Sequence, residues 1–223
     1  MYFCSMNSLT EENYLKALLH LSHESGEVNI KDLSKHLDIK MPSVTSMMKK
    51  MSEKGLVHYD SYKPVRLTDI GNKEAALIIR KHRLTEMFLV EKMGFRWDEV
   101  HHIAEQIEHV KAPAFFQKMD ELLGFPKFDP HGSPIPDKNG KMIWTTWIKL
   151  SECQVGDQVK ITGVGKSSDD FLKFLNSRNI ALSLSLKIVN YESFDGTMTV
   201  EYFGKQEVLS QTVCERLLVE RLP

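Results

Sequence analysis

The sequence of 223 residues predicts a mainly helical protein with a smaller β-rich domain at its C-terminal end. Apolar residues recur every three or four positions through the first half of the chain, which is the spacing of amphipathic helices. Prolines and glycines cluster between residues 124 and 140, and beyond them the chain changes to the pattern of β-strands. The change of period therefore separates a helical part from a small β-barrel.

The first seventy residues predict a helical unit that ends in a hairpin. We expect helices over residues 10–25, 30–38 and 42–54, and short strands over residues 56–59 and 64–67. Thr10 is expected to cap the first helix, with carboxylates in the first turn. Pro42 suits the first turn of the third helix, where its missing N–H is not needed. Three helices and a β-hairpin predict a winged helix-turn-helix domain over residues 7–70.

Positive charge is concentrated in this domain. From Lys31 to Arg66 there are eight Lys or Arg and four Asp or Glu, a net charge of +4 in a chain whose total is −1. A helix that exposes hydroxyls and lysines fits the major groove of DNA, and further basic residues contact phosphate. The alternative is a charged helix that faces only solvent. The predicted DNA contacts are Lys40, Pro42, Ser43, Thr45, Ser46, Lys49, Lys50, Lys63 and Arg66.

The rest of the chain divides into three parts. Further helices are expected over residues 68–93, 98–110 and 113–123. Strands are expected over residues 151–163, 182–189 and 197–203, with a helical insert at residues 169–175. These elements assign residues 71–124 to a helical domain, residues 125–149 to a proline-rich linker and residues 150–223 to the β-barrel.

Histidines and carboxylates converge in the helical domain. The helix expected over residues 98–110 projects four such side chains within an arc about 100° wide, namely His101, Glu105, Glu108 and His109. On the preceding helix, His82 and Glu86 are one turn apart and share a face. Buried carboxylates are costly unless a cation neutralises them, and imidazole with carboxylate oxygen suits divalent first-row metals. The pattern predicts a metal site, and the absence of thiolates argues against structural zinc.

Two other functions use the same residues differently. A metal-dependent hydrolase would activate a water at this site, but the spacing lacks the His-Glu-x-x-His form and leaves the basic wing unexplained. A winged-helix regulator could instead sense a small organic ligand, with the histidines as ordinary structural residues. Metal-dependent binding to DNA would distinguish these functions from a metal-dependent regulator.

Several segments of the chain carry a specific resemblance. They are the winged helix, Arg80-Lys81-His82-Arg83-Leu84-x-Glu86, the segment from Val100-His101 to Glu108-His109, and the proline-rich linker with the barrel behind it. With them the chain resembles the diphtheria toxin repressor and manganese transport regulator family of metal-dependent bacterial repressors over nearly its whole length. The resemblance implies a repressor of metal-uptake genes, not an enzyme, with a divalent metal as corepressor and an SH3-like, FeoA-like C-terminal domain.

The resemblance also implies two sets of metal ligands. The primary site would use His82, Glu105, Glu108 and His109, joined by Asn13 from the first helix. The second site would use Glu86, His101, Asp129, His131 and Asp170, with Asp169 as an equally reachable substitute for Asp170. No residue is assigned a catalytic role.

Three positions set this chain apart from parts of the family it resembles. Glu105 stands where iron-responsive members have a cysteine, and hard carboxylate oxygen favours Mn²⁺ as the cofactor, with Fe²⁺ as the alternative. Asn13 stands where members have methionine or aspartate, and can coordinate only through its uncharged amide oxygen. Lys16 replaces a carboxylate of some manganese regulators, which argues against an unchanged two-metal site.

These expectations combine into one mechanistic hypothesis. The metal would act as a clasp between the first helix, through Asn13, and the helical domain. The resemblance implies a homodimer built from the middle helices, and such a dimer must present its recognition helices about 34 Å apart to reach successive major grooves of operator DNA. Metal that favours this arrangement would raise the affinity for DNA.

Targeting features point to the cytoplasm. The first residues have no basic or long apolar segment typical of a secretory signal, and no apolar run is long enough to span a membrane. Three widely spaced cysteines, Cys4, Cys153 and Cys214, do not form a disulfide framework. Buried, unreactive thiols are the default expectation for Cys153 and Cys214.

Overall fold

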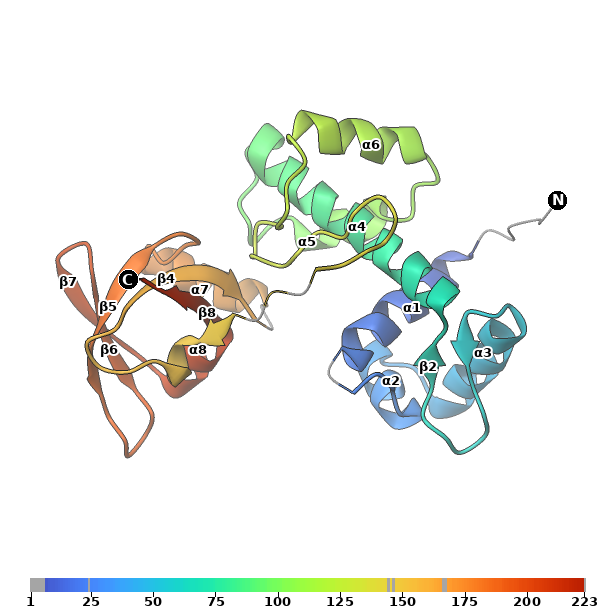
Figure 1. Ribbon diagram of the computed structural model, residues 1–223, viewed down its shortest axis with the longest axis horizontal. Coiled ribbons are helices and arrows are strands. Elements are labelled where there is room, and N and C mark those ends of the chain that lie inside the picture. The colour runs from blue at the N-terminus through green and yellow to red at the C-terminus, as the bar shows by residue number, and fades with distance from the viewer. Residues whose placement is uncertain (1–6, 24, 144, 146, 166–167, 223) are drawn as a thin grey trace. The chain divides into compact units, whose positions relative to one another are not determined.

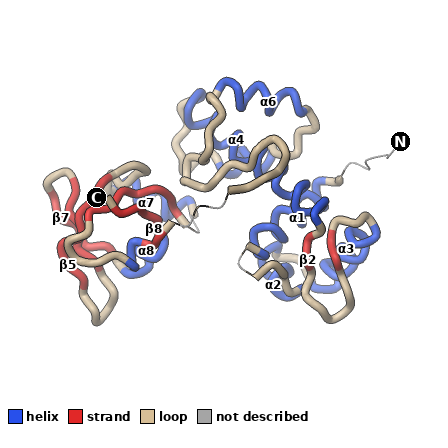
Figure 2. The backbone as a smooth tube through the Cα atoms, viewed as in Figure 1, coloured by secondary structure: helices blue, strands red, loops and turns tan. Residues whose placement is uncertain are grey.

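The computed structural model describes residues 7–23, 25–143, 145, 147–165 and 168–222 (Figure 1). The chain divides into two compact units. One comprises Met1–Thr85, Ala104–Lys118 and Ile135–Ile143, and the other Glu86–Ile103, Met119–Pro134 and Trp144–Pro223. Cys4 lies outside the described residues. Figure 2 shows that helices dominate the first part of the chain and strands the last, as the sequence predicts. The domain boundaries expected at residues 70, 124 and 149 stay predictions.

The N-terminal part is a winged helix-turn-helix. Its elements are α1 (Leu9–Ser22), α2 (Ile30–Leu37), α3 (Met41–Glu53), β1 (Val57–His58) and β2 (Arg66–Leu67). The two strands pair antiparallel, and a bridge from Val28 to Val65 joins the base of the wing to the segment before α2. Leu15, Leu33 and Met48 from the three helices are completely buried in one core. The architecture expected from the sequence is confirmed.

The start of α1 differs from the sequence prediction. Ser8, not Thr10, caps the helix: its hydroxyl accepts from the Glu11 amide, while the Glu11 carboxylate accepts from the Ser8 amide. The prediction was wrong because Thr10 and Ser8 both precede carboxylates at plausible spacing. With Ser8 as the cap, Glu11 is the third residue of the helix, which is the position that a capping box requires.

Three helices follow the wing. They are α4 (Asp69–Met93), α5 (His101–Ile107) and α6 (Pro113–Leu122). Thr68 caps α4 by accepting from the Gly71 amide at 3.0 Å. The helix expected over residues 98–110 is shorter in the structure, where α5 covers only His101–Ile107. The sequence prediction for α4 is confirmed nearly to the residue. In the described part of the chain, every helix is too short or too polar to cross a membrane.

The C-terminal part is a barrel-like, six-stranded antiparallel sheet in the order β3-β8-β4-β5-β6-β7. The strands are β3 (Ile148–Lys149), β4 (Gln158–Val164), β5 (Ser185–Tyr191), β6 (Met198–Tyr202), β7 (Lys205–Leu209) and β8 (Leu217–Arg221). Three helical segments accompany them: the 3-10 helix η1 (Leu150–Glu152), α7 (Asp169–Ser177) and α8 (Gln211–Arg216). Strands β4, β5, β6 and helix α7 were predicted from the sequence. The strand expected from residue 151 was wrong in its first half, because η1 and a turn precede β4.

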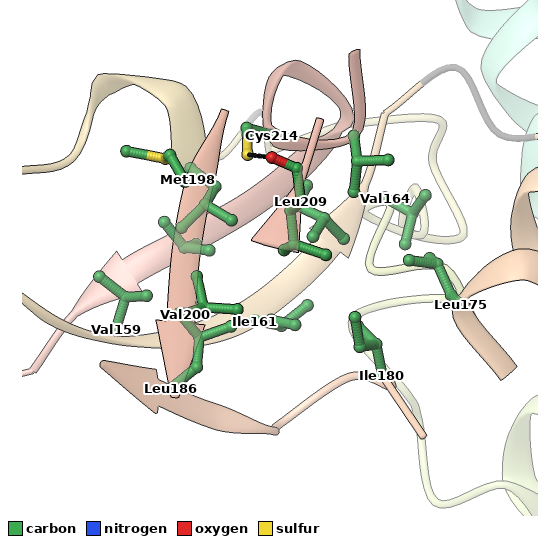
Figure 3. Packing of buried hydrophobic residues seen from close by; sticks show 14 of the residues in the cluster. Val159, Ile161, Val164, Leu175, Ile180, Leu186, Met198, Val200, Leu209 and Cys214 are labelled. Carbon is green, nitrogen blue, oxygen red and sulfur yellow. Dashed lines mark hydrogen bonds between the residues drawn. The ribbon is translucent and has the colours of Figure 1, made fainter. Parts of the chain in front are cut away.

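The barrel core contains both described cysteines. In Figure 3, Val159 and Ile161 of β4 lie beside Leu186 of β5 and Val200 of β6. Cys214 is completely buried, and its Sγ donates to the Leu209 carbonyl oxygen at 3.8 Å. Burial raises the pKa of the Cys214 thiol to about 12 and also raises that of Cys153. Both thiols are therefore held protonated and unreactive, as the default expectation stated.

Candidate metal centre and DNA-reading surface

The primary candidate site is built around Glu108, which follows α5 and is completely inaccessible to solvent. Its amide donates to the Ala104 carbonyl oxygen at 2.9 Å, so the turn of the helix continues through it. One carboxylate oxygen, Oε2, lies 2.6 Å from Nδ1 of His82 on α4. The other, Oε1, lies 3.6 Å from Nε2 of His109. Three of the predicted primary ligands therefore meet at one buried carboxylate.

Helix α1 reaches this cluster through Glu12, a residue that the sequence pattern did not assign to it. Glu12 is buried, and its Oε2 lies 2.6 Å from Nδ1 of His109. Lys111 also pairs with the Glu12 carboxylate. Asn13, the predicted ligand from α1, is exposed in this arrangement. The sequence shows a carboxylate at position 12, but its pattern indicated only a first-turn charge that interacts favourably with the helix dipole.

Two lysines offset the negative charge of the cluster. Nζ of Lys16, one turn after Glu12 on α1, donates to Oε1 of Glu108 at 2.8 Å and lies 3.6 Å from Oε1 of Glu105. Nζ of Lys81 donates to the Glu108 backbone carbonyl at 3.0 Å. Glu105, another predicted ligand, is half exposed at the rim. The cluster thus combines carboxylates, imidazoles and ammonium groups in a mostly buried space.

The surroundings of Glu108 and His109 keep both side chains in protonation states that can bind a metal. Burial alone would raise the pKa of Glu108, but the hydrogen bond from His82 and the charge of Lys16 outweigh it, so the pKa is lowered. Burial lowers the pKa of His109, and Lys16 and Lys81 lower it further against the opposing effect of Glu108. Glu108 is therefore ionised and His109 neutral near pH 7. Coordination requires these forms, so the residues fit a divalent cation.

A second cluster lies in the other compact unit. One ligand atom from each of Glu86, Asp129 and His131 lies within 4.8 Å of the others, and all three residues are buried. Nδ1 of His101 lies 3.2 Å from Oε1 of Glu86 at the exposed side of this group. The structure therefore brings together four of the five residues predicted for the second site. Asp170 and its neighbour Asp169 lie on the exposed first turn of α7.

The loop that carries Asp129 and His131 is held by its own hydrogen bonds. Oδ1 of Asp129 accepts from the amides of His131 at 2.8 Å and Ser133 at 2.9 Å. Nε2 of His131 lies 2.9 Å from the Trp97 carbonyl oxygen, and the two rings are stacked. Burial would lower the pKa of His131, but the nearby carboxylates of Glu86 and Asp129 outweigh it and raise the pKa. The loop is thus held in a defined conformation, within a segment that the sequence assigned to the linker while predicting Asp129 and His131 as ligands.

Gly132 explains why the loop can approach the barrel so closely. Its φ is +84°, and a Cβ at this position would lie 2.1 Å from the Thr162 carbonyl oxygen of β4. Beside this glycine, the Val164 amide of β4 donates to the His131 carbonyl oxygen of the loop at 2.9 Å. Only glycine fits this position without displacing β4 or the loop.

The predicted DNA contacts lie on α3 and the wing. All of them are exposed except Thr45, which is half-buried. An open hollow on α3 is lined by Pro42, Ser43, Ser46, Met47 and Lys50. Two predicted phosphate contacts on the wing are already in ion pairs, Arg66 with Glu27 at 2.6 Å and Lys63 with Asp60 at 3.2 Å. These exposed pairs are weak enough for phosphate to compete with them.

A third predicted contact, Lys50, forms an ion pair with a residue of α1. Oε1 of Glu11 lies 2.7 Å from Nζ of Lys54 and 3.2 Å from Nζ of Lys50, and the Glu11 side chain is almost completely buried. Burial would raise the pKa of Glu11, but the hydrogen bonds from Lys54, the Ser8 amide and Lys50 outweigh it and lower the pKa to about 2. Adjacent residues of α1 therefore contact different partners: Glu11 binds α3, and Glu12 binds His109.

Replacing Glu11 with Gln is expected to destabilise the winged-helix domain by about 1–3 kcal/mol at pH 7. The folded-state pKa of Glu11 is below its usual value of 4.5, so its contribution is complete above pH 4.5 and decreases as pH falls toward 2. Hydrogen-exchange protection of the α1 amides measures opening of this domain. The deficit of the variant should shrink between pH 6 and pH 3; a deficit independent of pH would contradict the assignment. Glu27→Gln, at an exposed pair, is the control.

Three family models match successive parts of the chain. The model described as "Iron dependent repressor, N-terminal DNA binding domain" matches residues 6–65. "Iron dependent repressor, metal binding and dimerisation domain" matches residues 68–137, and the FeoA domain matches residues 148–221. The diphtheria toxin repressor of Corynebacterium efficiens is 31% identical over 226 residues, which cover 96% of each chain. The chain belongs to the diphtheria toxin repressor family.

Some other members of the diphtheria toxin repressor family align over shorter lengths. The iron-dependent repressor IdeR of Mycobacterium tuberculosis is 33% identical over 133 residues, which are 59% of this chain and 58% of that protein. The chain therefore aligns with less than two thirds of the length of its mycobacterial relatives.

Solved structures from this family share the fold over nearly the whole chain. A manganese-dependent transcriptional repressor in complex with manganese superposes with a TM-score of 0.86 at 31% identity, covering 95% of this chain and all of the other. ScaR with bound Zn²⁺ superposes with a TM-score of 0.77 at 30% identity, covering 95% of this chain and 99% of ScaR. The fold class expected from the sequence is confirmed by both.

Proposed function

We propose that this chain is a metal-dependent transcriptional repressor that binds double-stranded operator DNA as a homodimer in the cytoplasm and controls metal-uptake genes. One observation carries the proposal. The buried cluster around Glu108 receives Glu12 and Lys16 from α1, a helix of the DNA-reading domain, as well as His82 from α4. Any ligand that changes this cluster changes how α1 is held, and so how α3 is presented to DNA.

A divalent cation in the primary site would be held by His82, Glu105, Glu108 and His109, with Asn13 as the further expected ligand. When bound, the cation supplies positive charge that neutralises the carboxylates. Glu12 prepares His109 for this role, because its carboxylate accepts the proton on Nδ1 and leaves the lone pair of Nε2 directed toward Glu108. Carboxylates that orient ligand histidines in this way are common behind metal sites.

We propose Mn²⁺ as the metal and Fe²⁺ as the alternative. The carboxylates of Glu105 and Glu108 provide hard oxygen ligands, which suit Mn²⁺ better than soft ions. Among relatives, one solved repressor is described as manganese-dependent, ScaR binds Zn²⁺ and Cd²⁺, and IdeR is described as iron-dependent. The choice of metal is therefore a property of each chain and must be measured for this one.

A second cation would be held by Glu86, His101, Asp129 and His131, with Asp170 or Asp169 as a further ligand from α7. The carboxylates of Glu86 and Asp129 are buried beside His131, and buried carboxylates are stabilised by a cation. The raised pKa of His131 favours a proton on this ring when no metal is bound. Metal and proton should compete here, so binding to this site should weaken as the pH falls.

Reciprocal coupling links the metal to DNA. If metal favours the dimer whose two recognition helices match successive major grooves, then metal raises DNA affinity and DNA raises metal affinity by the same factor. Couplings of about 1–3 kcal/mol are typical, which correspond to about 5–150-fold in affinity. The metal concentration at which uptake genes are silenced would follow from this factor.

Selection of bound sequences from a random duplex library tests the proposal and identifies the operator sequence in the same experiment. In Mn²⁺ we expect enrichment of a palindromic sequence, and fluorescence anisotropy with that duplex should show at least about 5-fold tighter binding in Mn²⁺ than in EDTA. Fe²⁺ under anaerobic conditions and Zn²⁺ provide the comparison of metals. DNA affinity that is unchanged by EDTA would refute the proposed function.

A further inference from the structure

Lys16 is placed where a cation is needed in the primary site. Its Nζ donates to Oε1 of Glu108 at 2.8 Å and lies 3.6 Å from Oε1 of Glu105. Nε2 of His109 lies 3.6 Å from that same Glu108 oxygen. One ammonium group therefore touches two predicted ligand carboxylates, at the oxygen that also faces a predicted ligand nitrogen.

The surroundings make this contact strong. The side chain of Glu108 is 0% exposed and that of Lys16 is 24% exposed, so water screens the pair poorly. A buried carboxylate without a compensating cation is strongly destabilising. His82 contacts the other oxygen of Glu108, with its Nδ1 2.6 Å from Oε2, so Oε1 is left to Lys16 and His109. Lys16 therefore contributes an ammonium group directly to the buried Glu108 carboxylate, at 2.8 Å from Oε1.

A divalent cation held by Glu108 and His109 would lie beside the same oxygen, because Oε1 is the Glu108 atom that faces Nε2 of His109. If Glu108 and His109 held a divalent cation while the Lys16 ammonium group stayed at hydrogen-bond distance from Oε1, two cations would lie close together. Repulsion between them in a poorly solvated space is large. The lysine and the metal thus compete for one position.

We propose that the Lys16 ammonium group is an internal competitor of the metal, which occupies the primary site in the metal-free protein and is displaced when a divalent cation binds. The inference rests on the proposed function and deepens it. Lys16 stabilises the metal-free form and thereby raises the metal concentration at which the site fills. Because Lys16 belongs to α1, its release also changes the contact between the DNA-reading domain and the metal-binding helices.

Lys16→Met is the direct test, because methionine keeps most of the length of the side chain and removes its charge. We expect Mn²⁺ to bind the variant at least 10-fold more tightly in isothermal titration calorimetry. The metal-free variant should also melt at a lower temperature than the wild type, because Glu108 loses its compensating charge. The two effects have one cause, so they should appear together.

Two further variants serve as controls. Lys16→Arg keeps the positive charge and should bind Mn²⁺ no more tightly than the wild type. Lys160→Met removes a lysine from an exposed pair with Glu220 in the barrel, and should leave both the Mn²⁺ affinity and the metal-free melting temperature unchanged. If Lys16→Met does not fold, Lys16→Gln retains a donor for Glu108 and takes its place in the same titration.

The unmodified protein provides an independent measurement. Acetic anhydride labels exposed lysine amines, and mass spectrometry locates the label. Labelling of Lys16 should increase when Mn²⁺ is added, while labelling of Lys160 should stay constant. Unchanged labelling of Lys16, or an unchanged or weaker Mn²⁺ affinity of Lys16→Met, would overturn the proposal. If the wild type itself binds no Mn²⁺ and no other divalent metal, the proposed function fails instead, so the two failures are distinguishable.

Discussion

Glu108→Gln is expected to abolish Mn²⁺-stimulated DNA binding while the chain remains folded. The substitution preserves the size of the side chain and can keep a hydrogen bond with His82 or Lys16, but it removes the buried negative charge to which three elements converge. Loss of this charge should weaken Mn²⁺ binding to the primary site by more than about 100-fold, beyond the loss typical of outer-shell residues. DNA affinity in Mn²⁺ should then equal DNA affinity in EDTA.

Fluorescence anisotropy with the selected duplex measures this effect, and circular dichroism verifies that the variant is folded. Glu215→Gln is the matched control, because Glu215 is an exposed carboxylate on α8 that accepts only from Gln211 among the contacts of the described residues. Its response to Mn²⁺ should be that of the wild type. A Glu108→Gln protein whose DNA affinity still rises in Mn²⁺ would show that the primary site does not control binding to DNA.

The helical part of the fold was predictable because its signals are local. Apolar spacing defined α2, α3 and α4, and turn residues marked their ends. The C-terminal part was harder, because α8 passes directly into β8 at Leu217 with no glycine or proline between them. Strand β8 pairs with β4 and β3, which are distant in sequence, so its existence depends on long-range contacts. Such pairings leave little trace in the local pattern.

The sequence predicted the candidate sites in part, as it did the fold. Helical periodicity placed His101 and Glu108 on one arc, and the structure brings them to the two clusters with their expected neighbours. Helical periodicity did not predict which side chain of α1 faces the helical domain. Glu12 and Asn13 differ by about 100° around the helix, and the partner surface that distinguishes them comes from residues almost one hundred positions later. The contact therefore had to be observed.

Helix α1 thus combines three contacts within two turns. Glu11 binds the lysines of α3, Glu12 binds His109, and Lys16 binds Glu108. The first contact faces α3 and the other two face the candidate primary site. A change of charge at the metal site therefore acts on the same short helix that positions α3. This is the physical basis for expecting substitutions in α1 to alter metal binding and DNA binding together.

Glu12→Gln is expected to weaken Mn²⁺ binding by about 10–100-fold, although Glu12 is not a predicted metal ligand. An ionised carboxylate can only accept, so the 2.6 Å contact between Glu12 and Nδ1 favours the His109 tautomer with its proton on Nδ1 and an unprotonated Nε2 beside Glu108. A glutamine can turn its amide and donate to Nδ1 instead. The proton of His109 would then sit on Nε2, and the ring would present a donor where the metal needs a lone pair.

Nitrogen-15 NMR of the histidine rings reports the tautomer of His109 directly, and calorimetry reports the Mn²⁺ affinity. Glu12→Gln should shift the metal-free ring toward the form protonated on Nε2. Lys111→Met is the control, since it removes the other partner of Glu12 but keeps the carboxylate that orients His109. Its tautomer should stay as in the wild type. If Glu12→Gln changed neither the tautomer nor the affinity, the contact between α1 and His109 would have a role in packing alone, and the route from the metal to the DNA-reading domain would have to run through Lys16.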